Sequence, residues 1–134
     1  MASVHTYVER GAPQGKLYQL DILVTCDAGT STITTTKIPY DLTNYYLFML
    51  RTYPGGTAPT DATDLYLYQH GSTGKDILDG AGVDKIDNTS TLTFQPFING
   101  GDNIVPIMGY LWLAASNNSV NAAIFTVELH MIRA

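Results

Sequence analysis

The residues whose types and spacing come nearest to a known binding motif lie between positions 76 and 87. The stretch "KDILDGAGVDKID" carries Asp76, Asp79, Asp84 and Asp87, and "DGAGVD" fits one copy of the Gly-x-Gly-x-Asp pattern of calcium-binding β-helices. Those sites need consecutive copies, and no glutamate closes an EF-hand loop. No Gly-Lys-Ser/Thr follows the glycines, so a phosphate loop is not indicated either. We expect a hairpin with the turn "GSTGK" and a glycine-rich exit, and the four aspartates are the candidate ligands if a cation binds.

Groups that could perform nucleophilic or acid–base catalysis are few and scattered. Cys26 is the single cysteine, at an inward-facing strand position that favours inert packing. His5, His70 and His130 are far apart, without metal-ligand spacing, and no Gly-x-Ser-x-Gly elbow is present. His130 shares a strand face with Glu128, where a carboxylate–imidazole pair on an exposed face would be solvated polar surface. The sequence therefore predicts no catalytic residues, no cofactor and no enzyme activity.

Aromatic residues are the remaining signal, with nine tyrosines and one tryptophan. Three interpretations stay open: core packing with cross-strand pairs, a protein-contact surface, or a platform on which sugar rings stack. The predicted interface residues are Tyr7, Tyr45, Tyr46, Tyr66, Tyr68, Tyr110 and Trp112.

The elements that must position these residues alternate with period two, which is typical of strands with one buried face. In "NAAIFTVELHMIR" Phe125, Val127, Leu129 and Met131 share one face, and "KLYQLDILVTC" and "DLYLYQH" alternate in the same way. "NYYLFMLRTY" is apolar on both faces, so we expect a strand covered on both sides, with a helix as the competing interpretation. "KLYQLDILVTC" and the threonine-rich residues 30–38 are expected to pair as a hairpin. Pro106 restricts its segment to an edge, a bulge or a strand start.

Strands recur between Gly, Pro, Asn and Asp turns, and no long helix is indicated. The prediction is an all-β fold, an antiparallel β-sandwich (jelly-roll or immunoglobulin-like) or a barrel. Residues 16–134 form one domain, and residues 1–15, which alternate poorly, form an extended N-terminal arm. We expect the arm to reach a neighbouring subunit, and its deletion to leave the isolated fold intact.

Charge and composition exclude some functions. The formal net charge is -5 and lysines are scattered, which argues against nucleic-acid binding. No apolar run is long enough to cross a membrane as a helix, and no secretory signal is recognisable. Only 14% of residues are charged, a low share that favours a surface partly covered by other molecules.

Two segments resemble small structural proteins of tailed bacteriophages. "GGTAPTDATDLYLYQHGSTGKDILDGAG" and "IVPIMGYLWLAASNNSVNAAIFTVELHM" are similar to strand–turn–strand segments of head decoration or cement proteins. The resemblance implies a β-sandwich virion component without catalytic residues, assembled in the host cytoplasm. It also implies a homo-oligomer, with a trimer favoured, that binds the major capsid protein or other virion proteins. The alternative is a neck or tail protein, or a carbohydrate- or receptor-binding module.

Overall fold

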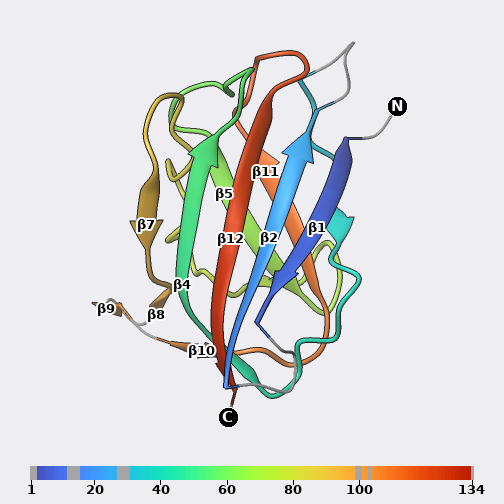
Figure 1. Ribbon diagram of the computed structural model, residues 1–134, viewed down its shortest axis with the longest axis vertical. Coiled ribbons are helices and arrows are strands. Elements are labelled where there is room, and N and C mark those ends of the chain that lie inside the picture. The colour runs from blue at the N-terminus through green and yellow to red at the C-terminus, as the bar shows by residue number, and fades with distance from the viewer. Residues whose placement is uncertain (1–2, 12–15, 27–30, 99–100, 103, 134) are drawn as a thin grey trace.

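Two antiparallel β-sheets stacked face to face make up the computed structural model of the chain (Figure 1). The structure describes residues 3–11, 16–26, 31–98, 101–102 and 104–133. In these ranges there is no helix, and neither main sheet closes on itself. The prediction of an antiparallel β-sandwich is therefore confirmed, and the structure is not a barrel.

The large sheet is built around the two longest antiparallel pairings. Strand β12 lies between β2 and β4, so the C-terminal strand is at the centre of the sheet. In spatial order the strands are β1 (Val4–Arg10), β2 (Leu17–Thr25), β12 (Ile124–Arg133), β4 (Tyr45–Pro54) and β10 (Val105–Pro106), and β7 (Leu92–Phe94) also pairs with β4.

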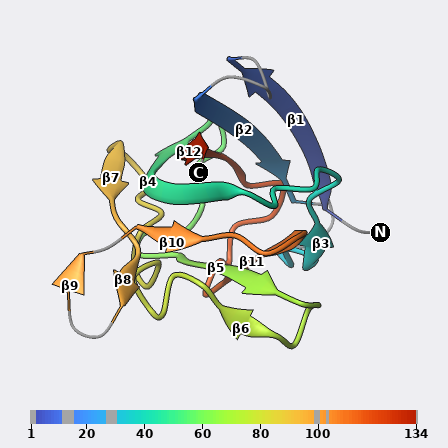
Figure 2. The same cartoon turned by 90° about the horizontal axis from the view of Figure 1, so that it is seen from below.

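The small sheet lies behind the large one, as the view from below shows (Figure 2). Its strands, in spatial order, are β3 (Thr36–Lys37), β11 (Leu111–Ser116), β5 (Asp64–Gln69) and β6 (Lys75–Asp76). A separate two-stranded sheet consists of β8 (Phe97–Ile98) and β9 (Gly101–Asp102).

The core is the space between the two sheets, and the period-two pattern fills it. Side chains at alternate positions of each long strand point to the other sheet, as a pleated strand requires. The residues predicted to face inward in β12 and β2 are all buried, and Leu65 and Leu67 meet them from the small sheet. The largest fully buried side chains are Phe125, Leu20, Ile22, Ile38, Leu42, Leu47, Leu50, Leu65, Leu67, Leu78, Ile86 and Leu111.

The sequence of β4 was also compatible with a helix, and a β-bulge in the strand explains why its alternation was ambiguous. The register between β4 and β12 shifts between His130 and Met131, which adds one residue to β4. Phe48 and Met49 both lie in the stretch where the register shifts, so strict alternation is lost in the sequence. The outer face of β4 is half-buried, so β4 is covered on one side and partly on the other.

Of three further local predictions, two are confirmed and one is wrong. The hairpin formed by residues 64–69 and 75–76 is present as the β5–β6 pair, and β10, which contains Pro106, lies at the end of its sheet. The predicted pairing of β2 with the threonine-rich segment is wrong. Strand β2 pairs with β1 and β12, whereas β3 pairs with β11 in the other sheet. Residues 31–36, which are mostly threonine, cross from one sheet to the other, because Ile33 alone in this segment offers a large apolar side chain to the core.

The N-terminal segment is extended, but residues 4–10 belong to the sandwich itself. All seven residues of β1 pair with β2, from Val4 opposite Thr25 to Arg10 opposite Gln19. The alternation is hard to read in the sequence because the inward positions carry His5, Tyr7 and Glu9. An arm that can be removed without loss to the fold is thus not what residues 4–10 form, and residues 12–15 lie outside the described part.

Deletion of residues 1–11 should therefore destabilise the protein. The deletion removes a complete β-ladder and leaves the long strand β2 as an open edge. We expect the thermal midpoint, measured by circular dichroism, to fall by more than about 5 °C, the shift produced by about 1–2 kcal/mol in a domain of this size. A variant that lacks only residues 1–2 keeps β1 and should have the same thermal midpoint as the intact chain. Equal midpoints for all three proteins would contradict the role of β1 in the fold.

Candidate functional site

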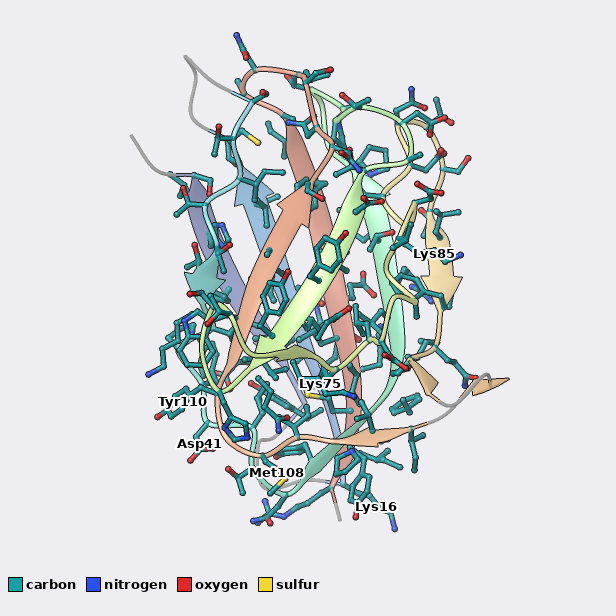
Figure 3. All side chains as sticks on the ribbon, turned by 180° about the vertical axis from the view of Figure 1, so that it is seen from behind. Lys16, Asp41, Lys75, Lys85, Met108 and Tyr110 are labelled. Carbon is teal, nitrogen blue, oxygen red and sulfur yellow. The ribbon has the colours of Figure 1, made fainter. Side chains whose placement is uncertain are left out.

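Four of the predicted interface residues gather on the outer face of the small sheet. Tyr66 and Tyr68 alternate with buried leucines on β5, and Trp112 lies directly opposite Tyr68 on the neighbouring strand β11. Tyr110, just before β11, is 38% exposed, and the other three rings are half-buried. We call Tyr66, Tyr68, Tyr110 and Trp112 the aromatic face. It lies on the side of the molecule seen in Figure 3, where Tyr110 is labelled.

Contacts within the aromatic face hold its rings in place. The Tyr66 and Tyr68 rings are nearly parallel, at 5°, with centroids 5.9 Å apart. Lys37 Nζ lies 4.1 Å from the Tyr110 ring centroid and 5.6 Å from that of Trp112, within cation–π range. Burial, followed by the charge of Asp76, raises the pKa of Tyr68, so its hydroxyl remains a neutral hydrogen-bonding group at pH 7.

The other three predicted interface residues lie elsewhere. Tyr45 is only 6% exposed and packs on Tyr18 in the core, so it is not a contact residue. Tyr7 points inward from β1 and its ring makes an edge contact with Tyr40. Tyr46 lies on the outer face of β4, on the large sheet. The core interpretation therefore fits Tyr45, and a surface interpretation fits the aromatic face and Tyr46.

The aspartate-rich loop is held together by its own carboxylates. Asp76 accepts hydrogen bonds from the main-chain N–H groups of Leu67, Leu78 and Gly80, at 3.1, 3.1 and 3.2 Å. A Cβ on Gly82 would lie 2.1 Å from the Leu65 carbonyl oxygen, so only glycine fits this close approach. Asp76 and the glycines thus act as turn residues, as the sequence predicted.

The remaining three aspartates do not converge on one point. Asp79 and Asp84 are exposed and have positive φ angles of 50° and 60°, conformations that aspartate tolerates in turns. Asp87 accepts hydrogen bonds from Ser90 and Thr89, and a hydrogen bond from Asp61 lowers the pKa of Asp87 and raises that of Asp61. Among the described residues no group of three or more His, Cys, Asp or Glu could hold a metal ion.

A polar cluster on the outer face of the large sheet was not anticipated. Asp21 and Glu128 are directly opposed on β2 and β12, and their side chains are only 10% and 9% exposed. Arg10 Nε lies 2.6 Å from Asp21 Oδ2, and Arg51 Nη1 lies 3.7 Å from Glu128 Oε1. Each carboxylate therefore has its own cation, which offsets the repulsion between the two.

His130 belongs to this cluster, so the predicted carboxylate–imidazole pair is real. Its Nε2 is 2.9 Å from Glu128 Oε1, and the His130 side chain is 15% exposed. The expectation that the pair is solvated is wrong, because neighbouring side chains cover it. Alternation revealed that residues 128 and 130 share a face, but the strand register that brings Asp21 beside them is not readable from either segment alone.

Cys26 is packed in the core. It is 2% exposed, and burial raises the pKa of its thiol, although a hydrogen bond involving the Ala123 backbone acts in the opposite direction. Asn118 Nδ2 lies 3.7 Å from its Sγ. A covered thiol with a raised pKa is a poor nucleophile, which fits the packing role inferred from the sequence.

The Asp21–Glu128 cluster should contribute to stability. Glu128→Ala removes the acceptor for His130 and the partner of Arg51, and we expect a loss of about 1–3 kcal/mol in the free energy of unfolding. Glu128→Gln retains an acceptor oxygen and should lose less. Urea denaturation of the three proteins measures both effects. A Glu128→Ala protein as stable as the wild type would show that the cluster contributes nothing.

Cys26 should be unreactive in the native state. At pH 8 we expect its reaction with a disulfide reagent such as DTNB to be slower by at least about a hundredfold than in 6 M guanidinium, since burial and the raised pKa both suppress the thiolate. Absorbance at 412 nm follows the reaction. Rapid labelling of the folded protein would contradict the buried position.

In the described residues no helix is long and apolar enough to span a bilayer. Comparison of the chain with protein-family models, curated proteins and solved structures gave no match.

Proposed function

We propose that this protein is a non-catalytic structural component of a tailed-phage virion, which binds the capsid through the aromatic face of its small sheet. The observation that carries the proposal is the position of the four rings. They lie outside a core that the leucine, isoleucine and valine side chains of both sheets already fill. Tyrosine and tryptophan are enriched at the energetic centres of protein interfaces, so rings left outside the core suit a contact surface.

Residues near the aromatic face support a contact surface further. Met108 is 63% exposed, and its main-chain N–H bonds to Gln69 Oε1 of β5, which ties the segment before Tyr110 to the sheet (Figure 3). Methionine is also enriched at interfaces. The bound surface would be the capsid, and the location the virion, on the strength of the sequence resemblance.

The electrostatic character of the face also suits a protein partner. Lys37 lies over the Tyr110 and Trp112 rings, although the chain as a whole is acidic. A flat aromatic centre with charges at its rim is the usual organisation of a protein interface, because water is excluded from the centre and retained at the rim.

Truncation of the aromatic face should weaken binding to capsids. Trp112→Ala removes the ring opposite Tyr68, and we expect binding to purified phage capsids that lack their decoration protein to weaken by about 30-fold, equivalent to about 2 kcal/mol. Co-sedimentation with capsids measures the affinity. Tyr46→Ala, which truncates a half-buried ring on the opposite sheet, is the matched control and should bind as the wild type does. Equal binding by both variants, or none by the wild type, would refute the proposal.

A saccharide-binding function is the second candidate, because the parallel rings of Tyr66 and Tyr68 beside Trp112 could also stack on sugar rings. Trp112 is the single tryptophan, so its fluorescence reports on this face alone. Saturable quenching by a saccharide, lost in Tyr68→Ala, would favour this candidate. Fluorescence that is unchanged across a panel of saccharides would leave capsid binding as the proposal.

A further inference from the structure

Strand β1 is the one long strand at a sheet edge among the described residues. The other strands that pair with one neighbour only are shorter: β7 has three residues, and β3, β6, β8, β9 and β10 have two each. Short edge strands are a common protection against unwanted pairing, whereas a seven-residue edge can accept another strand. Figures 1 and 2 both show β1 at the margin of the large sheet, with no further strand of that sheet beyond it in the described chain.

The hydrogen-bond alternation defines which main-chain groups of β1 are open. Cys26 N–H donates to the Ala123 carbonyl, so the even-numbered residues of β2 bond to β12. The odd-numbered residues of β2 must then bond to β1, where their partners are even-numbered. The N–H and C=O groups that point away from the sheet are therefore those of His5, Tyr7 and Glu9.

These open groups have no hydrogen-bond partners among the described residues. Ser3, two residues before His5, differs because its N–H and side chain bond to Thr34. In the described chain the side-chain atoms Nδ1 of His5 and the hydroxyl of Tyr7 are also buried without a partner. The unpaired part of the edge thus extends from His5 to Glu9.

We propose that this edge pairs with the same edge of a second copy of the chain, antiparallel, about a two-fold axis at Tyr7. In this register His5 lies opposite Glu9 of the second copy, and Tyr7 lies opposite its own counterpart. Every opposed pair of odd-numbered residues can exchange two main-chain hydrogen bonds, so all the open groups find partners. A shift by two residues in one direction would place Ser3, already bonded to Thr34, opposite Glu9. A shift in the other direction would place Gly11, which lies beyond the end of β1 and has a φ angle of 81°, opposite His5.

Hydrogen-bonding complementarity favours a second copy as the occupant. Burial lowers the pKa of His5, so its imidazole is neutral at pH 7, and its Nδ1 has no partner in the described chain. The Glu9 carboxylate, whose Oε2 accepts a hydrogen bond from Tyr18 of its own chain, faces this imidazole across the interface, and the pair occurs twice about the two-fold axis. Aliphatic side chains also lie beside the edge on the outer face of the sheet, where Val8 is 46%, Leu23 41% and Val4 62% exposed. Pairing would bring the two sets of side chains together and extend the large sheet across both copies.

The chain geometry permits the approach. Strand β1 ends at Arg10, and Gly11, with a φ angle of 81°, begins the turn toward β2. The strand of the second copy therefore ends opposite Val4, before it reaches the Ser3–Thr34 contact. The resulting assembly is a dimer of the chain and not the trimer expected from the resemblance. The surface is separate from the aromatic face, so the inference goes beyond the proposed function and does not depend on it.

Sedimentation equilibrium over a concentration series, at pH 7 and about 0.15 M salt, tests the pairing. We expect a monomer–dimer equilibrium for the wild type. Tyr7→Pro removes the outward N–H at the two-fold axis without touching a bond to β2, and should abolish the dimer. Tyr7→Ala loses the same ring but retains the N–H, so it should still dimerise. A circular dichroism spectrum like that of the wild type confirms that each variant is folded.

Charge reversal provides an independent test of the register. Glu9→Lys removes the carboxylate acceptor opposite His5 and should raise the dissociation constant by about tenfold or more. Adding His5→Glu to Glu9→Lys places unlike charges opposite each other in this register and should recover the dimer. Asp79→Lys, with the same change in charge on an exposed loop, should have no effect.

The inference is overturned if the wild type stays monomeric at every concentration. It is also overturned if Tyr7→Pro dimerises as well as Tyr7→Ala, or if the double charge reversal fails to recover the dimer lost in Glu9→Lys.

Discussion

The register of β2 between β1 and β12 is the constraint on which the rest of the structure depends. Even-numbered residues of β2 point their side chains into the core, and their main-chain groups form hydrogen bonds with β12. Odd-numbered residues point their side chains to the outer face, and their main-chain groups form hydrogen bonds with β1. A slip by one residue would expose Leu20, Ile22 and Val24 and bury Asp21 in the core. The same register places Asp21 beside Glu128 and leaves the main chain of His5, Tyr7 and Glu9 open at the edge.

Each sheet therefore has an apolar inner face and an outer face of different chemistry. The large sheet carries charged side chains that neutralise one another, with Arg10 and Arg51 each beside a carboxylate. The small sheet carries the aromatic face, where Lys37 is the nearest cation. Satisfied ion pairs hold strands in register, whereas half-exposed rings gain more from a partner that excludes water. This difference fits a structural role for the charged face and the proposed binding role for the aromatic face.

Sequence patterns predicted the fold class well, because residues such as Phe125, Val127 and Leu129 alternate strictly and have no competing period. They were insufficient where contacts between distant segments decide the outcome. The bulge in β4 obscured its alternation, and the polar residues His5 and Glu9 made β1 resemble an arm. Adjacent segments do not have to pair, which is why the β2–β3 hairpin prediction was wrong. Tyr66, Tyr68 and Trp112 could be assigned to strand faces, but their meeting on one surface required the β5–β11 register.

Amide hydrogen exchange measured by NMR at low protein concentration tests the β2 register most directly. We predict slow exchange for Thr6, Val8 and Arg10, which bond to β2, and fast exchange for His5, Tyr7 and Glu9, whose amides point to the open edge. On β2 itself the amides of residues 19–25 should be slow, because this part of the strand is paired on both sides. Fast exchange throughout residues 4–10, or slow exchange at the odd-numbered positions in place of the even-numbered ones, would contradict the register and the surfaces derived from it.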